Sequence, residues 1–421
     1  MTPRIIGYTL FFEVVDDMNS DSNAKKIVFN PETVSGGKKV YENVLYIIEE
    51  ADFSIKDSSV EFINCIFKSE NSERKIDIEK TKAVFKHCNF FIPLNVGFSN
   101  CLFDECRFEQ ISSTALFAEN SSTIHIENCL FYKNGTEDVL GSQIIVSDSA
   151  FYAKNITVKD GINAFGIEGL DSSLHLDKAE ILFNQGCGVS LKFCRFEISR
   201  SIIKNNGSGD NDFTQVMIEG SKGSVSDTKI EEGLNSNGIV VTDKSDVDIV
   251  RSKVCSHIKN GIAAERSSNI SIKNCQIEKN GDEYEETLQI WVDNSTLFLS
   301  DCLIQDGVCG VYAQKNSYVT VSLTQIKNNL GAVCVFESSK LDMRDCLIEM
   351  TVEKIPVWTE ESYAVFKNLT FTNNEHQKVV YMDSMTYVDM QNVRLDKNCR
   401  DALTIKNSKN VHTELKCLSD G

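Results

Sequence analysis

Two carboxylates, Glu265 and Asp293, are the side chains of this sequence best arranged to do chemistry. Glu265 follows the short apolar run Ile262-Ala263-Ala264, and Asp293 follows Ile290-Trp291-Val292. If these runs are strands on neighbouring turns of a repeat, the two carboxyl groups approach to roughly 5 Å, the separation of a retaining glycosidase pair. Trp291 and Tyr312 would then act as stacking platforms for a sugar beside them.

The opposing interpretation is that both residues are solvated surface acids, and the composition favours it. The chain carries 61 acidic residues against 43 basic ones, a net charge of −18. Glu219 is equivalent in position to Asp293 but lies three turns away, about 14 Å, which is too far for acid–base pairing. A lyase would also need a calcium-binding acidic cluster with a basic residue on the same face, and Lys192 alone does not supply it.

Cysteines form a second pattern that could carry chemistry, since several recur at one position of a repeat: Cys65, Cys88, Cys106, Cys129, Cys275 and Cys302. Side chains stacked in register point the same way, so four thiolates cannot converge tetrahedrally on zinc. The same parallel stacking strains a disulfide. We therefore expect reduced, buried thiols, with no metal and no other cofactor.

A repeat of roughly 23 residues positions these side chains. Its motif, apolar-x-apolar-x-Asn/Asp-small-x-apolar, is clearest at residues 60–67, 124–131, 270–277, 297–304 and 341–348. The small residue recurs at positions 65, 88, 106, 129, 156, 179, 201, 228, 252, 275, 302, 324, 346, 369, 393 and 416. Strict alternation excludes helical repeats and indicates three short strands per turn, each burying one face only when turns stack. The sequence therefore predicts an all-β fold, a single-stranded parallel β-helix (solenoid) of about 16 turns.

Asparagines mark the bends of this repeat. One column precedes the small residue, as at Asn155 and Asn368, and a second follows five residues after it: Asn134, Asn184, Asn206, Asn280, Asn329, Asn374 and Asn398. Asn tolerates a left-handed backbone, and stacked amides can bond to one another. We expect both columns to be internal, so the Asn-x-Thr triplets at Asn155 and Asn368 are given little weight as glycosylation sites.

With its repeating coils and Asn columns, the sequence resembles the pectate-lyase-like right-handed parallel β-helix superfamily over roughly residues 50–421. The resemblance implies a right-handed coil with an internal Asn ladder at one bend. In the enzymes of this superfamily, the substrate groove lies on the strand face beside that bend. The resemblance is specific for the fold and weak for function, because unrelated activities use this solenoid.

Residues 1–50 do not fit the repeat and are predicted to be an N-terminal cap, with residues 40–50 as a short amphipathic helix. Residues 51–421 are predicted to form the β-helix. At the other end, residues 415–421 close the last coil poorly. An exposed solenoid end favours end-to-end stacking or another homo-oligomer contact there.

Three enlarged acidic turns, beginning at Asn134, Asn206 and Asn280, lie three repeats apart and lead into similar strands. The strands are Gln143-Ile144-Ile145-Val146, Gln215-Val216-Met217-Ile218 and Gln289-Ile290-Trp291-Val292. Alternation along these strands predicts which side chains point inward: Ile144, Val146, Val216, Ile218, Ile290 and Val292. The side chains predicted to point outward are Gln143, Ile145, Gln215, Met217, Gln289 and Trp291, together with Val240, Ala263 and Tyr312 on the strands between and after them. This stripe would form a groove rimmed by Asp282, Glu283, Glu285 and Glu286. The alternative is that duplication of a three-turn unit preserved these residues without selection for binding.

The net charge disfavours nucleic acid or an anionic membrane as a partner, and permits a basic protein. The apolar run Ile5–Phe12 is too short to span a bilayer and lacks a cleavage site after it. Fifteen cysteines without an export signal suggest a reducing, cytoplasmic location. We therefore expect a non-enzymatic intracellular scaffold that binds a protein partner through the acidic-rimmed groove. The alternative is a polysaccharide lyase or glycoside hydrolase that binds a glycan there.

Overall fold

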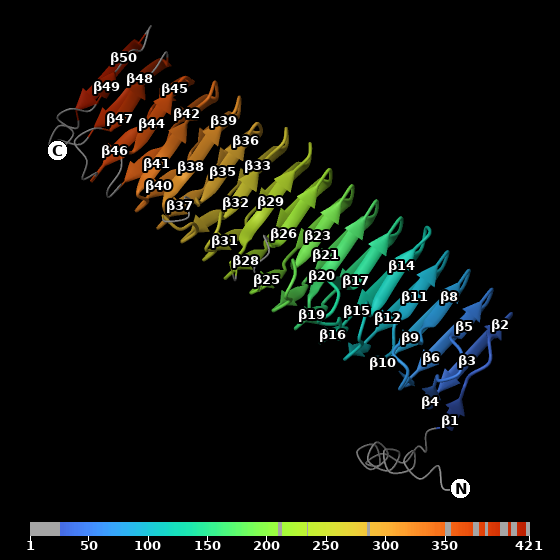
Figure 1. Ribbon diagram of the computed structural model, residues 1–421. Helices are drawn as coiled ribbons and strands as arrows, with labels where there is room; N and C mark the ends of the chain where they lie inside the picture. Colours follow the sequence, from blue (N-terminus) through green and yellow to red (C-terminus); the bar gives the residue numbers. More distant parts are fainter. Residues whose placement is uncertain are drawn as a thin grey trace.

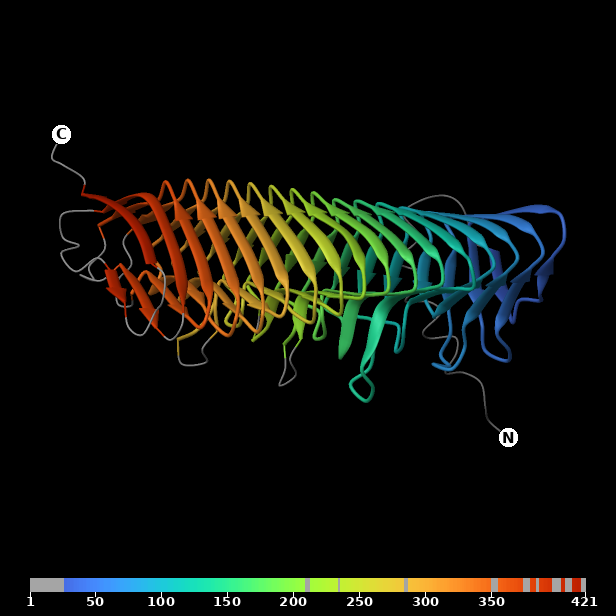
Figure 2. The ribbon, with the colours of Figure 1, turned by 90° about the horizontal axis from the view of Figure 1, so that it is seen from above.

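The chain winds into one parallel β-helix of about 15 coils, with its first and last described strands, β1 and β50, at opposite ends of a rod (Figures 1 and 2). This computed structural model describes residues 26–208, 213–233, 235–283, 287–349, 355–373, 379–383, 386–395, 403–405 and 411–417. Each coil within these ranges contributes three short strands, and no helix occurs among them. None of the described segments is therefore a helix long and apolar enough to cross a membrane.

The first strand of each coil joins one parallel sheet, which we call the groove sheet. Its strands are β2 (Val34–Ser35), β5 (Phe53–Lys56), β8 (Ile76–Glu79), β11 (Leu94–Gly97), β14 (Leu116–Glu119), β17 (Gly141–Ser147), β20 (Ala164–Leu170), β23 (Val189–Lys192), β26 (Thr214–Glu219), β29 (Asn237–Thr242), β32 (Ile262–Ala264), β35 (Ile290–Asp293), β38 (Cys309–Gln314), β41 (Gly331–Val335), β44 (Val357–Glu360), β47 (Val380–Asp383) and β49 (Leu403–Ile405).

The second strands of the coils follow after a bend. They are β3 (Lys38–Glu42), β6 (Ser59–Ile63), β9 (Lys82–Lys86), β12 (Asn100–Asp104), β15 (Thr123–Glu127), β18 (Ala150–Lys154), β21 (Ser173–Asp177), β24 (Arg195–Ser199), β27 (Lys222–Ser226), β30 (Asp246–Val250), β33 (Asn269–Lys273), β36 (Thr296–Ser300), β39 (Tyr318–Ser322), β42 (Lys340–Arg344), β45 (Tyr363–Lys367), β48 (Tyr387–Leu395) and β50 (Val411–Cys417).

The third strands complete each coil and belong with the second strands to one 33-stranded sheet. They are β1 (Lys26–Phe29), β4 (Val44–Ile47), β7 (Ile66–Lys68), β10 (Asn89–Phe91), β13 (Arg107–Glu109), β16 (Leu130–Tyr132), β19 (Thr157–Lys159), β22 (Glu180–Leu182), β25 (Ile202–Lys204), β28 (Lys229–Glu231), β31 (Lys253–Cys255), β34 (Gln276–Glu278), β37 (Leu303–Gln305), β40 (Gln325–Lys327), β43 (Leu347–Glu349) and β46 (Thr370–Thr372).

The small residues of the repeat lie in one internal column, as predicted. Cys65, Cys129 and Cys275 are each at most 3% exposed. The backbone N–H of Cys106 donates to Sγ of Cys129 at 3.2 Å, one coil further on. A short side chain with an acceptor atom is therefore favoured at this bend, because it accepts from the buried backbone N–H of the equivalent residue on the previous coil, which makes no strand hydrogen bond.

The thirteen described cysteines are all free, and every one except Cys334 is buried. Burial raises the pKa of Cys101 to about 12, so that thiol is neutral at physiological pH. No group of three His, Cys, Asp or Glu side chains in the described ranges has the geometry of a metal site. The stacked cysteines therefore behave as packing residues.

The expected helix over residues 40–50 is wrong. Strands β3 and β4 pair in parallel with β6 and β7, so these residues belong to a coil. Tyr46 stacks on Phe67 with ring centroids 4.8 Å apart, which gives this β-prone segment an aromatic column to join. The described β-helix thus begins as early as Lys26, and residues 1–25 and 418–421 of the predicted caps lie outside the described residues.

Candidate functional site

In strands β17, β26 and β35, most side chains point inward or outward as predicted. Their expected inward residues, Ile144, Val146, Val216, Ile218, Ile290 and Val292, are all fully buried. Ile145, Met217 and Trp291 point outward and are partly exposed. Val240 and Ala263 occupy the same outward column but are covered, at 6% and 1% exposure.

The prediction that Gln143, Gln215 and Gln289 point outward is wrong. All three side chains are fully buried, and the parallel pairing of β17 and β26 skips Gln143 and Gln215, so strict alternation does not hold at this point. Nδ2 of Asn280 donates to Oε1 of Gln289 at 2.7 Å, and Asn134 and Asn206 make the matching bonds to Gln143 and Gln215 at 2.8 Å. These glutamines belong to the internal ladder and not to a binding surface.

The two Asn columns differ in location. Asn134, Asn184, Asn206 and Asn280 are fully buried, and Asn329 is 1% exposed, as expected for an internal ladder. The column before the small residue is external instead. Asn155, with a φ of 53°, is exposed, and its Nδ2 donates to Oδ1 of Asn128 at 2.6 Å. A left-handed bend turns these side chains outward, so the expectation that they are internal is wrong.

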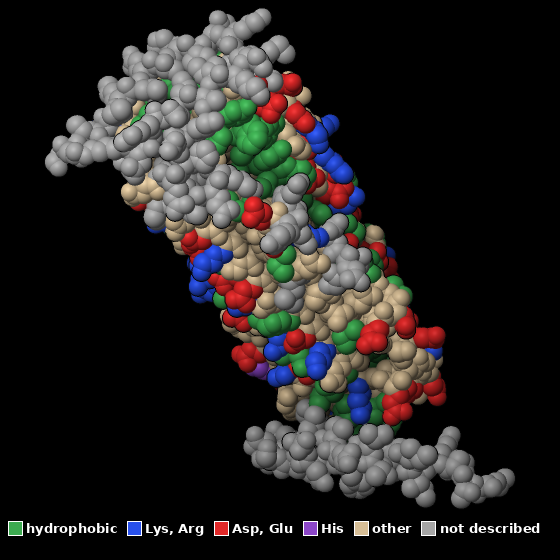
Figure 3. All heavy atoms as spheres, turned by 60° about the vertical axis from the view of Figure 1, so that its left-hand side comes forward, with side chains coloured by type: hydrophobic (Ala, Val, Ile, Leu, Met, Phe, Trp, Pro, Cys, Tyr) green, Lys and Arg blue, Asp and Glu red, His purple; other side chains and the backbone are tan. Residues whose placement is uncertain are grey.

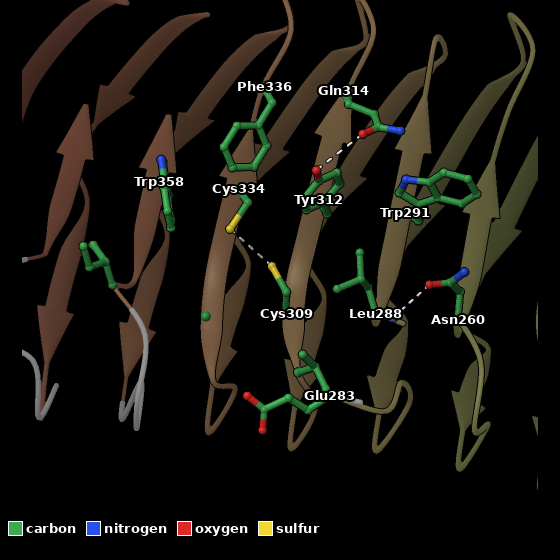
Figure 4. Close-up of a pocket in the computed structure, with 13 residues that line it drawn as sticks. Asn260, Glu283, Leu288, Trp291, Cys309, Tyr312, Gln314, Cys334, Phe336 and Trp358 are labelled. Carbon is green, nitrogen blue, oxygen red and sulfur yellow. Dashed lines mark hydrogen bonds between the residues drawn. The ribbon is translucent and has the colours of Figure 1, made fainter. Parts of the chain in front are cut away.

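An apolar groove lies on the outer face of the groove sheet toward the C-terminal end of the rod. Trp291, Tyr312, Cys334 and Trp358 occupy one outward column on β35, β38, β41 and β44. Figure 4 shows these side chains projecting into the groove, together with Phe336. The cavity has a volume of 670 Å³. A hydrophobic patch with charged side chains along one edge is visible toward this end of the rod in Figure 3.

The aromatic rings of the groove contact each other from coil to coil. Ring centroids are 5.2 Å apart for Tyr312 and Phe336, 5.9 Å for Phe336 and Trp358, and 5.4 Å for Trp358 and Tyr381. Sequence reasoning ended the stripe at Tyr312 and missed the next three aromatics. The repeat contains a signal for Trp358, since this residue follows the inward Val357 just as Trp291 follows the inward Ile290.

The wall of the groove beside the bend comes from the turns that precede the strands. Leu288, Val308 and Ile355 line it with apolar side chains. The backbone N–H of Leu288 donates to Oδ1 of Asn260 at 2.8 Å, which fixes this turn against the previous coil (Figure 4). Glu283 also lines the groove, with Asp282 beside it, whereas Glu285 and Glu286 of the predicted rim lie outside the described residues.

Glu265 and Asp293 follow paired strands on neighbouring coils, as the repeat predicts. Asp293 is neutralised, because its Oδ2 accepts from Lys315 Nζ at 2.6 Å and from Gln314 Nε2 at 2.8 Å. Glu265 is half-buried, and its carboxylate makes no hydrogen bond or ion pair with any described residue. Burial raises the pKa of Glu265, although the nearby Arg266 charge opposes this shift and Asp293 adds to it less strongly.

The family model named "Right handed beta helix region" matches residues 94–212 and 214–354, more than half of the chain. The chain therefore belongs to this family, and the expected right-handed parallel β-helix is confirmed. No match is found among curated protein sequences.

Solved structures show the same fold at low sequence identity. A chain of the Vag8–C1 inhibitor complex is 11% identical with a TM-score of 0.60, and the match covers 93% of this chain and 98% of that one. The A-module of mannuronan C-5 epimerase AlgE6 from Azotobacter vinelandii is 9% identical with a TM-score of 0.42, covering 85% and 91%. Pectate lyase Pel9A is 10% identical with a TM-score of 0.25, covering 78% and 70%. The match to the chain of the Vag8–C1 inhibitor complex, with its TM-score of 0.60, supports the β-helix fold.

Proposed function

We propose that this chain is a non-enzymatic recognition protein whose groove binds an extended, apolar segment of a protein partner. The observation that carries the proposal is the row of outward aromatic side chains, Trp291, Tyr312, Phe336 and Trp358, around a 670 Å³ cavity. Aromatic residues supply most of the binding energy in protein interfaces when they become buried. At 40% exposure, Trp358 has much of its surface left for a partner to cover.

The chemistry of the lining favours a peptide over a glycan. Sugar hydroxyls need many hydrogen-bonding groups, whereas, apart from the Tyr312 hydroxyl and two indole N–H groups, the polar side chains that line this groove are Asn260, Glu283 and Gln314. Oδ1 of Asn260 already accepts a hydrogen bond from the backbone N–H of Leu288. Successive aromatic rings are also tilted by 37°, 62° and 76°, so they do not present one flat stacking face.

The charge around the groove favours a partner with basic residues. Glu283 lines the groove, and Glu360 and Asp383 follow the aromatic residues of β44 and β47 on the same outer face. Together with the net charge of −18, these carboxylates would attract a basic segment and repel an acidic one. The neutral, buried thiols support a reducing location, and we propose the cytoplasm.

Selection from a displayed peptide library on the purified protein tests this proposal. Enriched peptides should be rich in apolar residues, and Phe336→Ala should weaken their binding at least about tenfold, as expected for an aromatic contact. Phe298→Ala is the matched control, because Phe298 is an exposed aromatic on β36, outside the groove. Failure to enrich any peptide, or equal weakening by both substitutions, would overturn the proposal.

A second candidate function is glycan cleavage with Glu265 as the general acid. The raised pKa of Glu265 beside an Asp293 that is ion-paired with Lys315 is the observation that favours it, since glycosidases place two carboxyl groups in different environments. Incubation with acidic and neutral glycans would test it. Cleavage that is lost in both Glu265→Gln and Asp293→Asn would replace the recognition proposal with an enzymatic one.

A further inference from the structure

Glu265 stands at the end of the groove where the aromatic row begins. It follows β32, whose Ala263 pairs with Trp291 of β35, so Glu265 lies one coil away from Trp291 and two residues further along the strand. Its outward position is shared by Glu219, Thr242 and Asp293 on the neighbouring coils. A ligand that covers Trp291 therefore reaches Glu265 with its next group.

The cations near Glu265 are engaged elsewhere. Nη1 of Arg266 lies 3.3 Å from Oδ2 of Asp243, and Nζ of Lys315 lies 2.6 Å from Oδ2 of Asp293. Glu219, on the other side, is paired with Lys192 at 2.7 Å. Of the carboxylates in this column, Glu219 and Asp293 have ion pairs, whereas half-buried Glu265 has none with a described residue, although the charges of Arg266 and Lys315 act on it from further away. A cation that came into direct contact would therefore stabilise it.

Thr242 provides a second and independent observation. Although it faces outward between Glu219 and Glu265, it is only 6% exposed. Its hydroxyl has no hydrogen-bond partner among the described residues. A buried hydroxyl without a partner is costly, so its presence beside an unpaired carboxylate indicates a donor supplied by a ligand.

We propose that Glu265 and the Thr242 hydroxyl together bind the cationic group of a Lys or Arg side chain, carried by the segment that occupies the groove. Such a group has several N–H donors, so it can donate to the Glu265 carboxylate and to Thr242 Oγ1 at once. Its stem or guanidinium plane can lie against Trp291. This inference rests on the proposed function, and it specifies the partner as an apolar segment with a basic residue at one end.

The peptides enriched from the displayed library also test this inference. Those that bind the wild-type protein should carry Arg or Lys at a fixed distance from their apolar residues. Glu265→Gln should weaken them at least about tenfold, whereas a peptide with Gln in place of that Arg should bind both proteins equally weakly. Asp248→Asn is the matched control for charge, because it removes an exposed carboxylate of β30, outside the groove.

Thr242→Val separates a ligand contact from a structural role. Removing an unsatisfied hydroxyl at nearly constant volume should leave the urea midpoint unchanged or raised, while binding of the basic peptides weakens severalfold. Apolar peptides without a conserved basic residue, or less than twofold weakening by Glu265→Gln, would overturn this inference and leave the proposed function standing. If no peptide is enriched, both are overturned.

Discussion

Nε2 of Gln143 lies 2.6 Å from Oδ1 of Asn184, although the two residues are 41 positions apart. At its other end, Oε1 of Gln143 accepts from Nδ2 of Asn134 at 2.8 Å. The intervening coil has Gly161 at the ladder position, where a Cβ atom would lie 2.7 Å from Oδ1 of Asn184. The glutamine amide therefore completes the internal ladder across a coil that has no ladder side chain of its own.

The same device recurs at the third enlarged turn, with Gln289 between Asn280 and Asn329 and Gly307 on the coil between them. Two of the three enlarged turns thus share one structural role for their Gln, whereas Gln215 bonds to Ser236 of the next coil. These glutamines have an internal role that does not depend on whether the surface above binds anything.

Gln289→Leu should destabilise the protein by about 1–3 kcal/mol. The substitution keeps the volume but leaves the buried amide groups of Asn280 and Asn329 without their partner. Urea unfolding followed by circular dichroism would measure the change. Gln325→Leu, at a partly exposed outward position, should stay within about 0.5 kcal/mol of wild type. Equal effects of the two substitutions would contradict the ladder assignment.

His257 occupies a ladder position and makes stability depend on pH. Its Nδ1 accepts from the backbone N–H of Gly233 at 3.1 Å, and its Nε2–H donates to the carbonyl of Ile230 at 3.1 Å. Burial lowers the pKa of His257 to about 4. The unfolded state, with a pKa near 6.5, binds the proton first, so the native state loses up to about 3 kcal/mol as the pH falls from 6.5 to 4.

His257→Asn should remove this pH-dependent loss, because Asn fills the same position on neighbouring coils. Free energies of unfolding at pH 7.5, 6 and 5 would show a shallower acid dependence for this variant than for wild type. His175→Asn, which replaces an exposed imidazole, should keep the wild-type slope. A wild-type slope in His257→Asn would show that other groups govern the acid sensitivity.

The fold was predictable because its evidence is spread over the whole chain. Alternating apolar residues and a small residue every coil define the columns, and Cys65, Cys129 and Cys275 do lie in one of them. The first coil was mistaken for a helix because residues 40–50 lack the Asn-small signature and their apolar pattern also fits a helix. Only pairing with the next coil distinguishes the two alternatives.

The candidate site was less predictable, for two physical reasons. Strict alternation predicts an outward Gln143, but the pairing of β17 skips this residue, and both Gln143 and Ile144 lie inside. The sequence does not predict the part of the groove beyond Tyr312, because Phe336 and Trp358 lie on coils that have no enlarged acidic turn before the strand. Whether Glu265 has an ion pair depends on which carboxylates Arg266 and Lys315 bind. The strand register alone does not determine that choice.

Cys334 should be the most reactive of the described cysteines. It is partly exposed in the groove between Tyr312 and Trp358, whereas Cys101 is fully buried and neutral. Brief treatment of the native protein with N-ethylmaleimide should modify Cys334 at least about tenfold faster than Cys101. Mass spectrometry of peptides would measure both rates, with urea-unfolded protein as the reference. Comparable native rates would mean that the groove is covered or that the core opens readily.

Gln143 and Gly161 should be energetically coupled. Gly161→Asn alone adds a side chain where Gln143 already lies, since a Cβ atom would be 2.7 Å from Oδ1 of Asn184, which Gln143 holds in place, and 3.0 Å from Nε2 of Gln143. Overpacking of this kind costs about 1–3 kcal/mol. Gln143→Ala alone removes one hydrogen-bond partner from each of the buried amides of Asn134 and Asn184. In the double variant, the new amide takes the place of the old one.

Because each change corrects the defect of the other, the double variant should be more stable than the sum of the two single effects by at least about 1 kcal/mol. Urea unfolding of the four proteins measures the difference. Gln143→Ala combined with Gly307→Asn is the matched control, because Gly307 faces Gln289 and lies too far from Gln143 to interact with it. That pair should be additive, and additivity in the Gln143–Gly161 pair as well would show that the glutamine does not substitute for a missing ladder residue.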